Sequence, residues 1–413
     1  MLKYFLVLAF LLITLFLRFF LFYQNQPYYK DGQDVSFETT LLSEPKIVGN
    51  QQRMSANLDG GNRILISTSL YPQFHYGDTL HIYGVLKNKV LKNGNTVLVM
   101  YFPKIETVKD NKNLFLAVAS FIRQKAISLF EKTLPATSSG LLLGIVFGVE
   151  ESLPIELADS LRISGVFHVV AASGMNVAFV GGFLSSIFGF FLNRQMAIVL
   201  SIIGILFYAV LAGLEPSILR ASIMGILVFT GQIIGRQNLS LYGLFLAGFA
   251  MLFWSPNIIF DIGFQLSFLA TAGLLYIRPL FERSKKVKVI LNRSVVGEGV
   301  VTTIAAQAAT LPILVSNFGS YSLWSIVANA LVLWTIPTLM VVGGVGVMIG
   351  MILKPLGGIF LYLSLPFLLY LEKVISVFAS FRGVVNLDVF PWQFTLSYYS
   401  FLIAFVLSFK RRK

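Results

Sequence analysis

Long apolar runs dominate this chain and limit it to one fold class. Residues 4–22, YFLVLAFLLITLFLRFFLF, form the first run, and many of similar length follow residue 137. Roughly 20 apolar residues in a helix cross the hydrocarbon core of a bilayer. With 56% hydrophobic and only 12% charged residues, a chain of 413 residues is too apolar for a soluble protein. The sequence predicts a polytopic α-helical membrane protein.

The helical part is predicted to comprise an N-terminal transmembrane anchor within residues 1–29 and a membrane domain over 137–413, with roughly nine to eleven helices. No small-residue cleavage site follows the first run, which indicates an uncleaved anchor. The segments near 164–192 and 323–352 are each expected to break in two. Such breaks are tolerated in a membrane where the backbone lines a cavity or packs on protein. In the membrane domain, helices are expected near 138–149, 164–192, 195–213, 216–234, 239–254, 261–279, 299–317, 323–352, 356–380 and 395–409.

Residues 30–112 have a different character, with short alternating runs separated by turn residues. The runs are VSFETTLL, RILISTSL, DTLHIYGVL and NTVLVMYF, and the turns include NLDGGN and KNGN. This pattern is typical of a small all-β extramembrane domain. Five or so strands favour a closed OB-like barrel, and a β-sandwich is the alternative.

Residues 113–136 are predicted to hold an amphipathic interfacial helix. Apolar residues recur at helical spacing through LFLAVASFIRQKAISLFEKT at 114–133, with charged residues between them. Such a helix lies on a membrane surface. A packed connector helix fits the same pattern.

The charge distribution indicates sidedness and has two explanations. Formal net charge is +13, but residues 30–112 carry ten Lys or Arg against eight Asp or Glu, so most of the excess lies in the membrane part. One explanation of this excess positive charge is that basic loops are retained on the cytoplasmic side of the membrane. The alternative explanation is binding of a polyanionic partner. The terminal KRRK and the basic loop 280–293 are expected to be cytoplasmic, and the β domain extracytoplasmic.

Ionisable and amide side chains inside apolar runs mark candidate functional positions, because each is costly in hydrocarbon. Glu215 and Arg220 form either a structural pair or cap, or the charged lining of a pore. Asp261 and Gln265 share a helix face, as an N-terminal cap with one interhelical bond or in a direct role. The candidates in this class are Arg162, His168, Glu215, Arg220, Arg236, Asp261, Gln265, Gln307 and Asn329.

The stretch GVFHVVAASGMNV at 165–177 concentrates polar groups in an otherwise apolar segment. A break at Ser173 and Gly174 would direct backbone groups, a hydroxyl and the His168 imidazole into one cavity. The alternative is a buried structural histidine. An intramembrane hydrolase using Ser173 and His168 has little support, since no third orienting group is evident nearby.

Other catalytic classes find no support in the sequence. The chain has no cysteine, and two of its three histidines, His75 and His81, lie in the β domain. No metal-ligand cluster and no phosphate-cradling loop are present. No cofactor, metal or catalytic residue is therefore expected, and the protein is not expected to be an enzyme.

Several motifs, in order, resemble the ComEC family of competence proteins, the DNA-uptake channels of bacterial inner membranes. They are LRISGVFHVVAASGMNVAFV, EPSILRASIM, the Gly235–Arg236 pair, SPNIIFDIGFQLSFLATAGLL and AAQAATLPILVSNFGSYSLWSIVANALVLWTIPTL. The likeness extends over residues 1–409, and the preceding β domain resembles the OB-like domain of that family.

Two departures from the family pattern limit what carries over. Asn176 stands where the family usually has a second histidine, and an amide neither titrates nor ligates a metal well. Many members also carry a C-terminal metallo-β-lactamase-like domain, which this sequence is expected to lack. Any nuclease would then be a separate protein.

The resemblance implies a cytoplasmic-membrane channel that passes single-stranded DNA into the cell. Expected partners are single-stranded DNA, membrane lipids, a DNA receptor, a cytoplasmic motor or single-strand-binding proteins, a separate nuclease and further copies of this chain. The rival function is a secondary transporter of a small solute or lipid that uses Glu215 and Asp261.

The resemblance also implies roles for individual residues. Arg162, Arg220 and Arg236 are candidate counter-charges for phosphates. Aromatic rings of the β domain are candidates for stacking on bases. The expected lining or motif positions are Gly165, His168, Ser173, Gly174, Asn176, Glu215, Asp261, Gln265, Gln307 and Asn329, and the expected DNA-binding rings are Tyr71, Phe74, Tyr76, Tyr83 and Tyr101.

Overall fold

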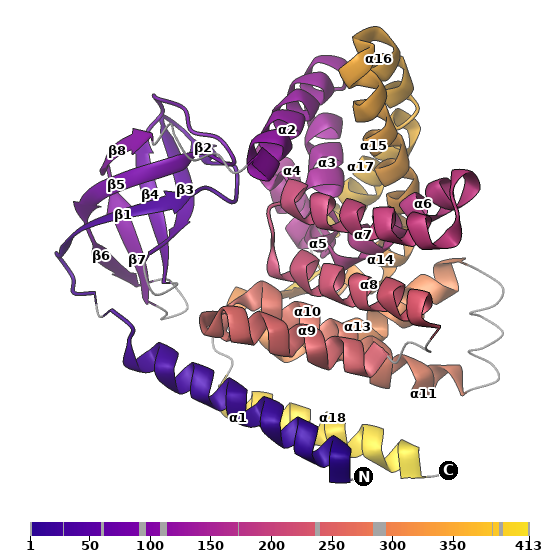
Figure 1. Cartoon of the computed structure of the whole chain (residues 1–413). Coiled ribbons are helices and arrows are strands. Elements are labelled where there is room, and N and C mark those ends of the chain that lie inside the picture. Colours follow the sequence, from indigo (N-terminus) through magenta and orange to yellow (C-terminus); the bar gives the residue numbers. More distant parts are fainter. Residues whose placement is uncertain are drawn as a thin grey trace.

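The computed structural model covers the whole chain, and Figure 1 shows a β domain beside a large helical part. It describes all residues except 1, 28, 59–61, 91–95, 108–113, 172, 236–239, 284–294, 382, 388–390 and 412–413. Arg236 and most of the basic loop expected at 280–293 therefore lie outside the described residues.

The β domain consists of eight described strands in two sheets. The three-stranded sheet has the order β1-β5-β8, and the five-stranded sheet has the order β2-β3-β4-β7-β6. The strands are β1 (Asp34–Thr40), β2 (Lys46–Val48), β3 (Gln51–Asn57), β4 (Arg63–Ser69), β5 (Thr79–Val85), β6 (Lys87–Val90), β7 (Thr96–Tyr101) and β8 (Lys104–Thr107).

The two sheets join into one closed ring, because three chain segments contribute a strand to each. β1 and β2, β5 and β6, and β7 and β8 are successive halves of the same bent segments. Around the ring, β1–β2 pairs with β3, β3 with β4, β4 with β7–β8, that segment with β5–β6, and β5 with β1. All pairs are antiparallel except β4 with β7. Closure with one parallel pair confirms the small barrel predicted from the sequence.

Helices make up most of the rest of the chain. They are α1 (Leu2–Gln24), α2 (Leu114–Thr133), α3 (Ala136–Phe147), α4 (Ile155–Ser164), α5 (Phe167–Val170), α6 (Gly174–Phe191), α7 (Arg194–Leu211), α8 (Pro216–Ile234), α9 (Ser240–Trp254), α10 (Ile262–Tyr276), α11 (Arg278–Glu282), α13 (Val295–Phe318), α14 (Ser325–Val332), α15 (Ile336–Ile352), α16 (Lys354–Tyr362), α17 (Leu365–Ser380) and α18 (Trp392–Arg411). Two short antiparallel strands, β9 (Ser320–Ser322) and β10 (Val384–Asn386), pair the α13–α14 connection with the α17–α18 connection.

The helices confirm a polytopic membrane protein. Among the described residues, seven helical segments are long and apolar enough to cross a bilayer, and the bent pair α16–α17 would make an eighth. Shorter apolar helices occur at Ala9–Gln24, Ala136–Phe147 and Ser240–Trp254. The break expected within 164–192 lies between α5 and α6, where Ala171 and Ser173 are extended. The segment Ser325–Ile352 is not divided, because a 3-10 turn at Leu333–Thr335 continues the helix, and the bend of 46° between α16 and α17 was not expected.

A buried arginine joins the β domain to the helical part. Arg123 of α2 is 3% exposed, and its guanidinium lies over the ring of Tyr76 at 4.7 Å. Its Nη1 donates to the carbonyl of Leu211 at 3.2 Å, and the Tyr76 hydroxyl donates to the carbonyl of Val210. Both acceptors belong to the last turn of α7, where a helix end attracts positive charge. The joint thus combines a cation–π contact with a helix C-terminus.

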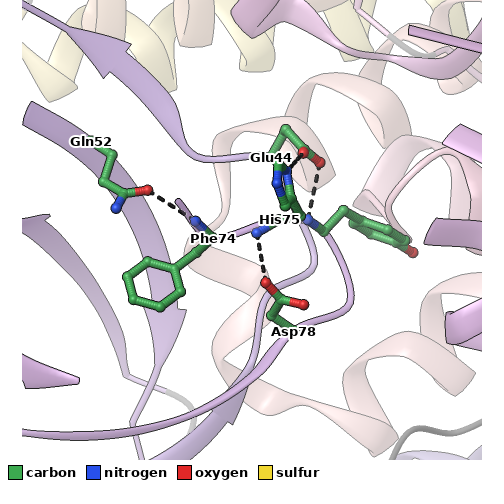
Figure 2. Close-up of polar contacts among 6 residues, drawn as sticks. Glu44, Gln52, Phe74, His75 and Asp78 are labelled. Carbon is green, nitrogen blue, oxygen red and sulfur yellow. Dashed lines mark hydrogen bonds and ion pairs between the residues drawn. The ribbon is translucent and has the colours of Figure 1, made fainter. Parts of the chain in front are cut away.

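The loop between β4 and β5 carries Tyr76 into this joint and is held by side chains (Figure 2). Glu44 Oε2 accepts from the Tyr76 backbone N–H at 3.0 Å, and Glu44 Oε1 lies 3.0 Å from His75 Nδ1. Asp78 accepts from the His75 N–H at 2.8 Å, and Gln52 accepts from the Phe74 N–H at 3.3 Å. Burial raises the pKa of the Tyr76 phenol, so its hydroxyl remains protonated and able to donate.

The turn after α7 is fitted against the β domain. Gly213 has φ +90°, and a Cβ there would lie 2.8 Å from the carbonyl oxygen of Leu42. Leu214 follows at φ +55°, a left-handed conformation that is costly for a branched side chain. The β domain therefore packs closely, through Leu42, against the connection between α7 and α8.

Two elements differ from the sequence expectation for identifiable reasons. Strand β3 was not expected, because its sequence QQRMSAN is polar outside and carries Gln52, Met54 and Ala56 inside. Helix α4 was not expected either, because its Glu156, Asp159 and Arg162 keep it below the hydropathy of a span.

Replacing Tyr76 with Phe tests the joint. The variant keeps the ring under Arg123 but leaves the Val210 carbonyl without its donor, which should cost about 1–2 kcal/mol. We expect the thermal midpoint in nanodiscs to fall by roughly 2–4 °C. The matched control is Tyr71→Phe on the exposed surface of the same domain, which should leave the midpoint unchanged. Equal midpoints for the two variants would contradict the joint.

Candidate functional site

The chain leaves helical geometry between α5 and α6. Ala171 and Ser173 have extended backbones, and Gly174 begins α6. The break expected from the Ser-Gly pair is therefore present, and it frees the first N–H groups of α6 at a point within the apolar part of the chain.

Arg220 of α8 lies directly against this break. A Cβ on Gly174 would lie only 2.6 Å from Arg220 Nη2, so glycine allows the guanidinium to approach the start of α6. Arg220 Nε donates to Ser267 Oγ at 2.7 Å, and Nη1 donates to Thr271 Oγ1 at 2.5 Å. Among the described residues, no carboxylate lies within ion-pairing distance of Arg220. Its Nη1 also contacts the Met224 sulfur at 3.7 Å, so the partners of Arg220 among the described side chains are all uncharged.

Among the described residues no ion pair joins Glu215 to Arg220, which was one of the interpretations of these two residues. Glu215 occupies the N-cap position of α8, without a side-chain bond to the first turn, and Pro216 follows as the first helical residue. Asp261 forms the predicted N-terminal cap of α10, because its Oδ1 accepts from the Phe264 N–H at 2.9 Å. Gln265 donates to the carbonyl of Ile259 at 2.9 Å, a local bond and not the expected interhelical one.

The Asn176 side chain is buried and forms hydrogen bonds that hold neighbouring helices together. It is 1% exposed, its Nδ2 donates to the carbonyl of Ile145 at 2.9 Å, and its Oδ1 accepts from Ser173 Oγ at 3.1 Å. Tyr208 of α7 donates to the neighbouring carbonyl of Val146 at 3.1 Å. These two side chains satisfy carbonyls at the end of α3 and tie three helices together.

Gln307 belongs to a second polar cluster, distant from Arg220 in sequence. Its Nε2 donates to Ser325 Oγ at 2.9 Å, and its Oε1 accepts from the Tyr321 hydroxyl at 2.8 Å. Asn329, one turn beyond Ser325, is buried with its Oδ1 unpartnered among the described residues. Gly165 packs against this cluster, since a Cβ there would lie 2.5 Å from Ser325 Cβ.

The two remaining polar candidates lie before the break. Arg162 pairs with Asp159 of its own helix at 2.7 Å and lies over the ring of Phe167. The His168 side chain is accessible although Val166, Val169 and Val170 around it are buried.

The five aromatic residues expected to stack on bases divide into two groups. Tyr71, Tyr83 and Tyr101 are 72%, 50% and 48% exposed. Phe74 and Tyr76 are almost fully buried, the first in the barrel core and the second in the joint with α2 and α7. The expectation was wrong for these two, because an enclosed ring offers no face to a base.

The outer face of the five-stranded sheet carries positive charge without any acid. Its strands contain five cations and no Asp or Glu, and every one of the cations is exposed: Lys46, Arg53, Arg63, Lys87 and Lys89. Lys46, Arg53, Ser67 and Tyr101 lie opposite one another in one row across the sheet. The row therefore places two exposed cations and the half-exposed ring of Tyr101 in one line across the sheet.

Sequence reasoning missed two charged groups. Arg123 was grouped with the charged residues between the apolar positions of the 114–133 helix, although it lies on the buried stripe of α2 with Ala119, Ala126 and Phe130. Glu372 of α17 accepts from Ser138 of α3 at 2.7 Å, and its presence in an apolar helix was the signal that could have identified it.

Comparisons with known proteins place these features in a family. The sequence matches the Competence protein family over residues 145–412. It is 24% identical to ComE operon protein 3 of Bacillus subtilis (strain 168) over 353 residues, which cover 78% of this chain and 44% of that protein. It is 27% identical to an uncharacterized protein of Aquifex aeolicus (strain VF5) over 241 residues, or 58% of this chain and 55% of that one. The chain thus spans about half the length of the curated relatives it matches, and no solved structure matches it.

Replacing Gly165 with Ala tests the contact between α4 and the Gln307 cluster. Gly165 and Gly235 end their helices at φ +76° and +72°. An alanine would therefore cause the same backbone strain, about 1–2 kcal/mol, at either position. Only Gly165 meets a neighbour, Ser325, whereas nothing lies within 4 Å of Gly235. We expect Gly165→Ala to lower the thermal midpoint in nanodiscs clearly more than Gly235→Ala, and equal losses would refute the contact.

Proposed function

The chain belongs to the Competence protein family, and from this premise we propose that it is a bacterial cytoplasmic-membrane channel that passes single-stranded DNA into the cytoplasm during natural transformation. The observation that carries the proposal is Arg220, a cation among apolar helices whose described side-chain partners are uncharged. The name of the Bacillus relative, a ComE operon protein, agrees with a role in DNA uptake.

The charge of DNA explains why such a residue is needed. Each nucleotide brings one negative charge into a medium of low dielectric constant, and a pore must supply cationic and polar groups to compensate. Arg220 provides the charge, and the first N–H groups of α6 beside it add the positive end of a helix dipole. Hydroxyl partners hold the guanidinium in place without neutralising it.

One ion pair links the acid-free sheet of the β domain to α10, the helix whose hydroxyls hold Arg220. Arg63, at the end of the acid-free sheet, lies 3.8 Å from Asp261 at the start of α10. Ser267 and Thr271, which hold Arg220, follow Asp261 on the same helix by six and ten residues, or about 9 and 15 Å of helix rise. A strand bound on the sheet would therefore meet Arg220 next, along α10.

The orientation of the channel follows from its basic segments. Arg283, after α11, donates to the carbonyl of Phe409 at 2.6 Å, so the basic loop and the basic tail begin at one end of the bundle. The N- and C-termini lie together at one end in Figure 1, away from the β domain. By the positive-inside rule that end is cytoplasmic and the β domain is extracytoplasmic.

The proposal assigns residues 1–29 to the anchor, 30–112 to DNA guidance, 113–136 to an interfacial helix and 137–413 to the channel. The implied partners are a DNA receptor outside and a motor or single-strand-binding proteins inside. A transporter that uses Glu215 and Asp261 has less support, because Asp261 is already engaged by the α10 N-terminus and by Arg63.

The first experiment measures entry of labelled DNA into cells that carry Arg220→Gln. Loss of the counter-charge should lower entry about tenfold while leaving DNA at the cell surface, and Arg220→Lys should recover part of the rate. The matched control is Arg194→Gln, which removes an exposed charge at the other end of the bundle. Normal entry in an Arg220→Gln strain with normal protein levels would reject the channel assignment of Arg220.

A second experiment measures oligonucleotide binding by the full chain in nanodiscs as salt is varied. Phosphate contacts make log K fall linearly with log salt, by about 0.7 for each single-strand contact. Replacing Lys46 and Arg53 with Gln should make the slope shallower by about one to two. Two outcomes would contradict a phosphate-binding sheet: an unchanged slope, or the same change in Lys132→Gln on α2.

A further inference from the structure

An open hollow of about 450 Å³ lies where the β5–β6 and β7–β8 segments bend. Its aromatic lining is Tyr83 of β5, Tyr101 of β7 and the following Phe102, and its charged lining includes Lys87, Lys104 and Asp34. In Figure 1, β5, β6 and β8 lie on the side of the barrel away from α2 and α7. The hollow therefore belongs to a face that the helical part does not cover.

The aromatic rings around the hollow are exposed without a packing reason. Tyr83 and Tyr101 are about half exposed and Phe102 is 58% exposed, whereas Phe37 and Phe74 are buried in the core of the domain. Tyr71 is exposed as well, but it does not line the hollow. Clustered exposed rings on an extramembrane surface mark a binding site. Their faces are the surfaces that nucleobases use for stacking.

Phe102 is also held in a costly backbone conformation. Its φ of +48° lies in the left-handed region, which a bulky residue rarely occupies. Its N–H donates to the carbonyl of Ser67 at 2.7 Å, which fixes this conformation at the end of β7. Glycine would remove the strain at this position, so the presence of a bulky ring indicates a function for that ring.

The two lysines of the hollow can each contact a phosphate next to a stacked base, beside the single carboxylate of Asp34. Lys87 lies beside the rings on β6, and Lys104 follows Phe102 on β8. Lys104 pairs with Glu106 at 2.9 Å, but both side chains are largely exposed, and such a pair contributes little. A strand phosphate can replace the Glu106 carboxylate as the partner of Lys104.

The hollow also continues the basic row of the five-stranded sheet. Tyr101 is the last residue of that row, after Lys46, Arg53 and Ser67, and it lines the hollow as well. A strand that follows the row reaches the hollow at Tyr101 without leaving the surface of the barrel.

We propose that this hollow holds a nucleotide of single-stranded DNA, with the base stacked on Phe102 and Tyr83 and its phosphates beside Lys87 and Lys104. The inference rests on the proposed function and specifies how its β domain captures the strand. Stacking uses the face of any base, so the site accepts all sequences.

The test compares two probes on the full chain in nanodiscs: a fluorescent dT oligonucleotide, and an abasic oligonucleotide of equal length that keeps its phosphates. The main variant is Phe102→Gly, which removes the ring and relieves the strained backbone. A second is Tyr83→Thr, which keeps a strand-forming residue. The control is Val90→Thr, an exposed apolar residue of β6 outside the hollow.

We expect both ring variants to bind the dT oligonucleotide about tenfold more weakly and the abasic one unchanged. Equal effects on the two probes, or no effect on either, would overturn the nucleotide site while leaving a phosphate-binding β domain intact. If the wild-type protein binds neither probe, the proposed function itself fails together with the site.

Discussion

The contact of Arg123 with Tyr76 and the end of α7 is the interaction on which the relation between the two parts depends. A buried guanidinium without a carboxylate is costly, and here a ring face and helix carbonyls compensate for the cost. The partners come from three separated segments of the chain. The β domain can therefore take only one position over the α7–α8 turn, and α8 begins from that position.

The bilayer explains the rest of the polar architecture. Without water, backbone and side-chain groups must find partners inside the protein. Asn176 and Tyr208 satisfy the end of α3, and Gln307 closes a ring with Tyr321 and Ser325. Arg220 differs from these groups, because its partners among the described side chains are two hydroxyls and the Met224 sulfur, none of which carries a charge. That difference is why we propose an anion-binding role for Arg220 and a structural role for the others.

Sequence reasoning succeeded where one physical rule dominates. Bilayer thickness fixes the length of apolar helices, so the spans and the Ser173–Gly174 break were predictable, as were strands with clear alternation. It failed where partners are distant: Arg220 is held by residues 47 and 51 positions away, and Arg123 reaches across 88 positions. Nothing local distinguishes the buried Tyr76 from the exposed Tyr83. Burial of a ring depends on which domain packs against it, and alternation alone does not report that.

Closure of the barrel has a consequence for how its surface can change over generations. Around the ring, the backbone donors and acceptors of each strand pair with those of its neighbours. A ligand of the barrel surface is therefore bound by the side chains that point outward. Those side chains contribute little to the barrel core. Single substitutions on this surface can therefore strengthen or weaken the binding proposed for it, while the barrel beneath remains the same.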